Sequence, residues 1–199
     1  MMLSRLSPYL LWLILALPAL GFMSSAFSTT DPRVFRELLH PTGEFGARLL
    51  IITMIATPLA MVFRGWRGPR WLKKNRRYFG VAAFGYSLLH LGFYLIDRAT
   101  VAKILNEVTD LDIWTGWLAF VIFLPLAATS FDAAVKAMGP QWKNIQRGVY
   151  AAAGLTLLHW ATHDAFSGLA PALIHFGPLI GLETYRIWYW YLRPRPTPV

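Results

Sequence analysis

The chain has 199 residues, of which 56% are hydrophobic and only 15% are charged. A mean hydropathy of +0.44 excludes an ordinary soluble domain, and the lack of cysteine excludes disulfides, iron–sulfur clusters and cysteine-ligated metals. The net charge of +9 does not indicate a nucleic-acid partner, because the Lys and Arg residues gather in short segments between apolar blocks. These features predict a single transmembrane domain over residues 1–199, surrounded by membrane lipid.

Six apolar blocks of roughly helix-spanning length follow one another along the chain. The first, residues 6–23, follows Arg5 and precedes small residues, so it fits either a retained span or a cleaved signal peptide, and we expect a retained span. The other spans are expected at residues 47–63, 78–96, 112–129, 149–166 and 169–190. No strand pattern and no repeat is visible, so the predicted fold is an all-α, integral membrane six-helix bundle.

Basic residues are concentrated in alternate connections between these spans. Seven of them lie within residues 64–77, and Lys136, Lys143 and Arg147 lie between the fourth and fifth spans. The connections on the other side, residues 31–44 and 97–110, are more nearly balanced in charge. The positive-inside rule therefore places the basic segments and both termini in the cytoplasm.

Two histidines lie deep inside apolar spans, His90 in the third and His159 in the fifth. At a rise of about 1.5 Å per residue, His90 lies about 20 Å from Arg77 and His159 about 18 Å from Arg147, so both fall at one level in the outer half of the bilayer. A polar ring in hydrocarbon is costly and indicates a functional site. Two such rings on different helices predict a group held between them, and haem iron is the first candidate. Zinc fits less well, because no compact cluster offers three or four ligands.

The other histidines leave alternatives open. His163, one turn beyond His159 on the same helical face, is either a second candidate ligand or a hydrogen-bonding residue near the surface. His175 lies in the outer half of the sixth span, and His40 is expected in the loop before the second span. Because membrane histidines also bond neighbouring helices or relay protons, the alternative to a haem protein is a proton-coupled or small-solute transporter that uses the intramembrane histidines His90, His159, His163 and His175 as a relay. A haem-free assembly partner is a third interpretation.

Arg48 opens the second span at its outer side, one helical turn after Glu44. One interpretation of this spacing is an i,i+4 ion pair at an exposed site. The other is a contact with a haem propionate, because the expected level of Arg48 lies just beyond that of His90 and His159. The sequence supports the two interpretations about equally.

Five stretches of the chain resemble one known family in their order and spacing. They are HPTGEFGARLLIITMIATPL (residues 40–59), RRYFGVAAFGYSLLHLGFYL (76–95), PLAATS (125–130), GPQW (139–142) and VYAAAGLTLLHW (149–160). In these stretches the chain resembles the MsrQ (YedZ) family of the ferric reductase-like transmembrane superfamily, over roughly residues 38–165.

The resemblance implies a ferric reductase-like transmembrane domain that binds b-type haem in the bacterial inner membrane. The axial ligand positions of the family match His90 and His159. The resemblance also implies that electrons arrive from a cytoplasmic flavin reductase, with quinol as the other donor considered. They leave for a periplasmic molybdopterin-type methionine sulfoxide reductase subunit. FMN is associated with the family too, although no residue here can be assigned to it. The chain is therefore expected to be an electron-transfer subunit rather than a complete enzyme.

One position departs from the family pattern. The family has a further histidine near the start of the fifth span, in a Trp-x-x-Leu-His-x-x-Val-Tyr context, where this chain has WKNIQRGVY with Gln146. Glutamine is not a normal haem ligand, and Arg76 and Arg77 occupy the inner end of the third span. We therefore expect one haem, in the outer half of the membrane. A flavin could supply the inner step of electron transfer; the alternative is that this chain is a divergent relative with another partner.

Overall fold

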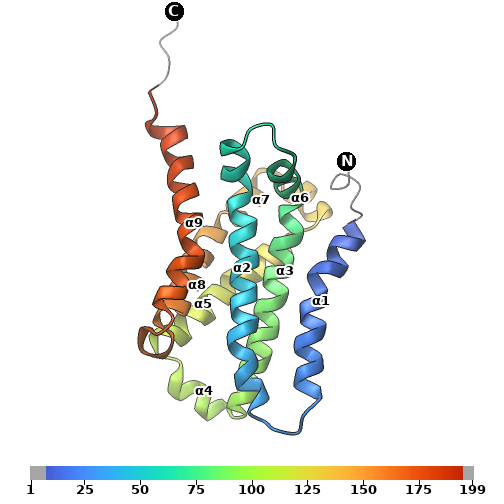
Figure 1. Ribbon diagram of the computed structural model, residues 1–199, viewed down its shortest axis with the longest axis vertical. Coiled ribbons are helices and arrows are strands. Elements are labelled where there is room, and N and C mark those ends of the chain that lie inside the picture. The colour runs from blue at the N-terminus through green and yellow to red at the C-terminus, as the bar shows by residue number, and fades with distance from the viewer. Residues whose placement is uncertain (1–7, 195–199) are drawn as a thin grey trace, which may run out of the picture.

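The computed structural model describes residues 8–194, and all regular structure in this range is helical (Figure 1). The helices are α1 (Pro8–Phe27), α2 (Val34–Val62), α3 (Arg67–Arg98), α4 (Val101–Glu107), α5 (Leu111–Ala128), α6 (Asp132–Met138), α7 (Pro140–Gln146), α8 (Gly148–Phe166) and α9 (Leu169–Ile187), followed by the π-helical turn η1 (Trp188–Leu192). The predicted all-α membrane class is confirmed, with three short helices in the connections.

The long helices run alternately up and down in one bundle (Figure 1). α2 packs along α3, α5 packs along α8, and α9 lies against both α2 and α8, whereas α1 covers the outer side of the α2–α3 pair. The α2–α3 connection, α6 and α7 lie at the end of the bundle where α1 begins and η1 ends (Figure 1). The basic segments therefore share one end, as the predicted topology requires, and α4 lies at the other.

Four of the described helices, α1, α2, α3 and α5, are long and apolar enough to cross a membrane. α8 and α9 have 19 residues each, a length of roughly 30 Å, and they carry His159, Asp164, Glu183 and Arg186. α8 and α9 pack in the same bundle as these four helices, which is consistent with the prediction that they form the fifth and sixth spans.

Two spans extend further than the sequence suggested. α2 begins at Val34 rather than near residue 47, so the prediction that His40 lies in a loop is wrong. The extension is held by tertiary packing, because Leu38 is buried against Phe93 and Ala26. α3 begins at Arg67 instead of near residue 78. The added residues are rich in Lys and Arg, which have a high helix propensity, so the helix continues beyond the predicted span.

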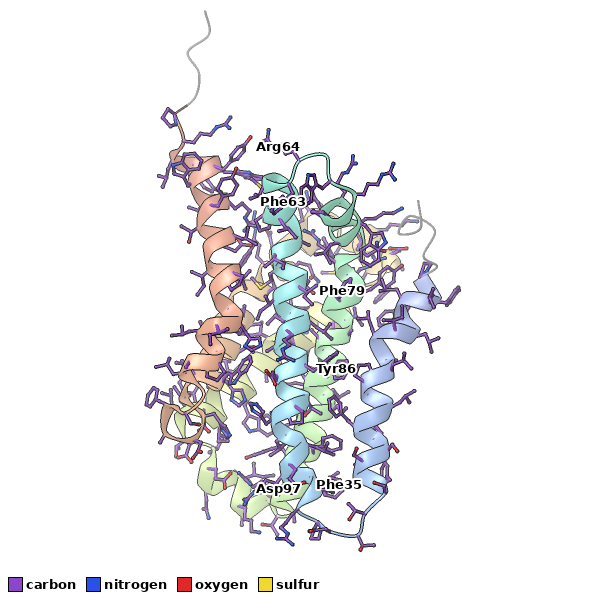
Figure 2. The ribbon with its side chains drawn as sticks, in the orientation of Figure 1. Phe35, Phe63, Arg64, Phe79, Tyr86 and Asp97 are labelled. Carbon is purple, nitrogen blue, oxygen red and sulfur yellow. The ribbon has the colours of Figure 1, made fainter. Side chains whose placement is uncertain are left out.

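Tyr86 fastens α1 to the rest of the bundle, and Figure 2 shows its side chain between α3 and α1. Its hydroxyl donates to the carbonyl of Leu15 at 2.8 Å and accepts from the backbone N–H of Ala19 at 2.9 Å. In an uninterrupted helix these two backbone groups bond each other, so the tyrosine is inserted into the hydrogen-bond ladder of α1 next to Pro18.

Candidate functional site

The structure brings His90 of α3 and His159 of α8 together in the outer part of the bundle. Their ring centroids are 6.0 Å apart and the ring planes are inclined at 81°. Metal–imidazole bonds of about 2 Å place the centroids of two imidazoles on opposite sides of one metal ion about 6 Å apart. The separation of the two rings therefore suits a single metal ion held between them.

The second ring nitrogen of each histidine is bonded to the backbone of a neighbouring helix. His90 Nδ1 lies 2.9 Å from the carbonyl oxygen of Leu39 on α2, and His159 Nδ1 lies 2.5 Å from that of Asp112 on α5. A carbonyl only accepts, so Nδ1 carries the hydrogen in both rings and Nε2 keeps a free lone pair. Metal-binding histidines commonly have this arrangement, which fixes both the tautomer and the direction of the ring.

Each ring also lies directly against a glycine of the neighbouring helix. A methyl group at Gly43 would come within 3.0 Å of His90 Nδ1, and one at Gly116 would come within 2.8 Å of His159 Nδ1. Ordinary contacts begin at 3.4 Å, so no larger residue fits at Gly116 unless the ring or a helix moves. The two glycines thus let the histidines reach the backbone carbonyls.

A buried threonine precedes each of these glycines. The hydroxyls of Thr42 and Thr115 both donate at 2.6 Å to the carbonyl four residues earlier. They also lie 3.1 and 3.0 Å from the carbonyls of Leu39 and Asp112, which accept the histidine N–H groups. Thr42 and Thr115 are fully buried and belong to the support of the two rings. Neither threonine was predicted from the sequence, although Thr-Gly occurs in both helices.

The helix pairs α2–α3 and α5–α8 carry the same sequence pattern, so the prediction that the chain has no repeat is wrong. AAFGYSLLH (residues 82–90) on α3 and AAAGLTLLH (151–159) on α8 share the pattern Ala-Ala-x-Gly-x-Ser/Thr-Leu-Leu-His. Ser87 and Thr156, at equivalent places, each donate to the carbonyl four residues earlier. α2 and α5 run in one direction while α3 and α8 run in the other (Figure 1). The histidines face each other across this internal repeat.

Two cavities flank the histidine pair, and both are lined by His90, His159, Gly43 and Tyr94. The first extends toward the middle of the bundle between apolar and aromatic side chains, which include Ala47, Leu50, Ile113, Trp117, Phe120 and Phe123. The second opens toward a polar rim formed by His40, Glu44, Arg98 and His163. A flat apolar ligand with polar groups at one edge matches this distribution.

Helix α8 breaks at His163, one turn after His159. The backbone of His163 is extended (ψ 137°), and Asp164 and Ala165 have left-handed φ values of 47° and 50°. The His163 side chain is 60% exposed, with Nδ1 3.3 Å from Asp112 Oδ2. It therefore lies at the rim of the outer cavity, whereas His159 faces His90.

Arg48 forms the ion pair that its spacing suggested. Its guanidinium lies 2.5 Å from Glu44 Oε1 and donates from Nε to His175 Nε2 at 3.1 Å. The side chain is exposed and lines neither of the two cavities beside the histidine pair. The propionate interpretation gains no support from this position.

A third cavity, of about 300 Å³, lies near the basic end of the bundle. Five cationic side chains line it, Arg76, Arg77, Lys143, Arg147 and Arg186, and no histidine does so among the described residues. Gln146 also lines it, but both of its amide contacts, 3.0 Å each, go to the end of α5, where the acceptors are Leu126 O and Thr129 Oγ1. The residue that stands at the missing ligand position therefore ties α7 to α5.

The described residues contain no group of three or more His, Cys, Asp or Glu side chains able to hold a metal ion. The chemistry available at the histidine pair is thus that of two neutral imidazoles from facing helices, surrounded by apolar walls.

Comparison with known proteins gives an independent view of the chain. Residues 42–157 match the family model of the ferric reductase like transmembrane component. Among curated proteins, the chain is 34% identical to the protein-methionine-sulfoxide reductase heme-binding subunit MsrQ of Polaromonas naphthalenivorans, over 79% of this chain and 73% of that protein. It is 31% identical to the protein of the same name from Ralstonia nicotianae, over 89% of this chain and 84% of that protein.

A third relative of that name, from Deinococcus radiodurans, is 33% identical over 67% of this chain and 66% of its own length. No solved structure matches the chain. The matched region contains both supporting Thr-Gly pairs and His90, and the alignment with the first relative covers most of the bundle. The chain therefore belongs to the ferric reductase-like transmembrane family and, within it, to the MsrQ group.

Proposed function

We propose that this protein is a membrane electron-transfer subunit in which His90 and His159 ligate the iron of one b-type haem through Nε2. The observation that carries the proposal is the facing pair of rings, 6.0 Å apart, with each Nδ1 bonded to a backbone carbonyl. The curated relatives are named as heme-binding subunits, which supports the same cofactor here.

The residues of the chain have separable roles in this proposal. The carbonyls of Leu39 and Asp112 orient the rings, and Gly43 and Gly116 allow the rings to approach them. The apolar side chains of the inner cavity wall exclude water from the site. A haem held by His90 and His159 would supply one-electron transfer rather than oxygen or substrate activation.

We further propose a cytoplasmic flavin reductase or a quinol as electron donor and a periplasmic methionine sulfoxide reductase catalytic subunit, of the molybdopterin type, as acceptor. The names of the relatives as subunits of a methionine sulfoxide reductase support an acceptor of this kind. The basic segments gathered at one end of the bundle support a cytoplasmic location of that end, in the bacterial inner membrane.

FMN is our proposal for the third cavity, because its cationic lining is suited to a phosphate group. The cavity has no histidine among its described lining residues, which supports one haem per chain instead of two. A flavin there would lie between a cytoplasmic donor and the haem.

Purification in detergent, followed by oxidised and dithionite-reduced spectra with haem quantified against protein, tests this function. We expect about one haem per chain, lost in His90→Ala and in His159→Ala but retained in His175→Ala, a matched control whose side chain lines neither cavity beside the histidine pair. Two haems per chain would show that the inner cavity also holds one. No haem after expression with ample haem supply would refute the electron-carrier function and favour the transporter or assembly interpretation.

A further inference from the structure

Tyr94 is a buried tyrosine whose hydroxyl proton has no acceptor among the described residues. It lies on α3 four residues after His90, and it lines both cavities beside the histidine pair. The residue is 8% exposed, and its Oη is one of two buried side-chain atoms without a partner among the described residues. Buried hydroxyls are nearly always bonded, so an unpartnered one that faces a cavity indicates a missing acceptor.

The groups around the ring hold Tyr94 in place without accepting its proton. Trp117 contacts it edge-on, with centroids 6.4 Å apart, and the Arg98 guanidinium lies over the ring at 5.3 Å from the centroid. The Arg98 donors are directed to Asp97 and Glu107, both at 2.6 Å. A guanidinium has only hydrogen-bond donors, so Arg98 cannot accept the proton of the Tyr94 hydroxyl.

The carboxylates at the outer rim are also engaged elsewhere. Glu44 is paired with Arg48 at 2.5 Å, and Asp112 lies 3.3 Å from His163. The acceptor that Tyr94 lacks therefore has to come from outside the described chain, and it has to enter the cavity that the histidines share.

We propose that the Tyr94 hydroxyl donates a hydrogen bond to a propionate carboxylate of the bound haem, which makes Tyr94 a cofactor-binding residue. This inference rests on the proposed function. The edge of a b-type haem carries hydrocarbon substituents apart from its two propionates, so these are the acceptors that the ligand offers. The polar rim of the outer cavity, with His40, Arg98 and His163, is the side on which carboxylates are best accommodated. Tyr94 thus takes the role that the sequence considered for Arg48.

The test compares the full-length protein with Tyr94→Phe, loaded either with haem b or with haem dimethyl ester, whose carboxylates are blocked. The rate of haem transfer to excess apomyoglobin is measured for each. Loss of a hydrogen bond to a charged group raises the rate of haem transfer about tenfold. We therefore expect Tyr94→Phe to lose haem b about tenfold faster than the wild type. With the dimethyl ester, the two proteins should lose haem at the same rate.

Tyr86→Phe is the matched control, because it removes a buried hydroxyl from the same helix at a site that lines neither cavity. It should lower the unfolding temperature and leave haem transfer unchanged, whereas apo Tyr94→Phe should unfold no earlier than the wild type. Equal haem b loss from Tyr94→Phe and wild type would mean that water satisfies the hydroxyl, and would overturn the inference. An equal acceleration with both haems would indicate a packing effect and would overturn it too. Failure of the wild type to bind either haem would refute the proposed function itself.

Discussion

Gly116→Ala is the substitution that most directly tests how the histidine pair is positioned. The new methyl group would lie 2.8 Å from His159 Nδ1 and 2.9 Å from Cε1, against the 3.4 Å at which ordinary contacts begin. Either the ring or α5 has to retreat by about 0.6 Å. That movement strains the 2.5 Å contact between Nδ1 and the carbonyl of Asp112, which aims the ring.

Overpacking of this size typically costs about 1–3 kcal/mol. Because the strain falls on the ring that holds the cofactor, we expect it to weaken haem binding by roughly 5- to 150-fold. Gly43→Ala, where the methyl group would lie 3.0 Å from His90 Nδ1, should have a smaller effect of the same kind. Gly154→Ala is the control, since it lies on α8 with nothing within 4 Å of the added methyl group.

The assay is haem occupancy and the rate of haem transfer to apomyoglobin, measured on the three variants and the wild type. The expected order of haem loss is Gly116→Ala, then Gly43→Ala, then Gly154→Ala together with the wild type. Wild-type haem retention in Gly116→Ala would refute the reasoning, because it would show that the contact between the ring and the glycine does not position His159.

Two further predictions concern parts of the fold away from the histidines. Gln146→Ala removes two 3.0 Å hydrogen bonds to α5 and should lower the unfolding free energy by about 1–3 kcal/mol without changing haem content. Thermal unfolding and pyridine haemochrome assays measure these two quantities. A loss of haem would give Gln146 a role in cofactor binding. Gly168→Ala should prevent normal folding or cost more than about 3 kcal/mol, because its methyl group would lie 1.9 Å from the carbonyl oxygen of Trp160. Unchanged detergent stability of Gly168→Ala relative to Gly154→Ala would contradict this packing.

The sequence predicted the helices well because apolar length is a strong signal. It predicted the shared level of His90 and His159 because the rise along a helix is fixed. It failed at Val34–Gly46, where charged residues suggested a loop and packing of Leu38 against α3 extends the helix instead. It did not predict the break in α8 at residues 163–165, where no proline is present. The supporting carbonyls are invisible to any residue-based argument, because every residue has one.

The repeat could have been found from the sequence. Ala-Ala-x-Gly-x-Ser/Thr-Leu-Leu-His occurs twice, but small residues are also common wherever membrane helices pack closely, so their presence alone does not indicate a repeat. Thr42 and Thr115 could be found in the same way, by comparing the two copies. A single Thr-Gly dipeptide carries little information, and its role becomes visible only when each copy is seen beside the carbonyl that bonds a histidine.

The insertion of the Tyr86 hydroxyl into α1 has a consequence for the order in which the protein is assembled. α1 leaves the ribosome before α3, so its Leu15 carbonyl and Ala19 N–H first meet the membrane without the tyrosine that later separates them. In that interval the two groups satisfy each other, because lipid offers no alternative partner. α1 therefore enters the bilayer as a continuous helix and takes its final shape only when the α2–α3 hairpin arrives beside it.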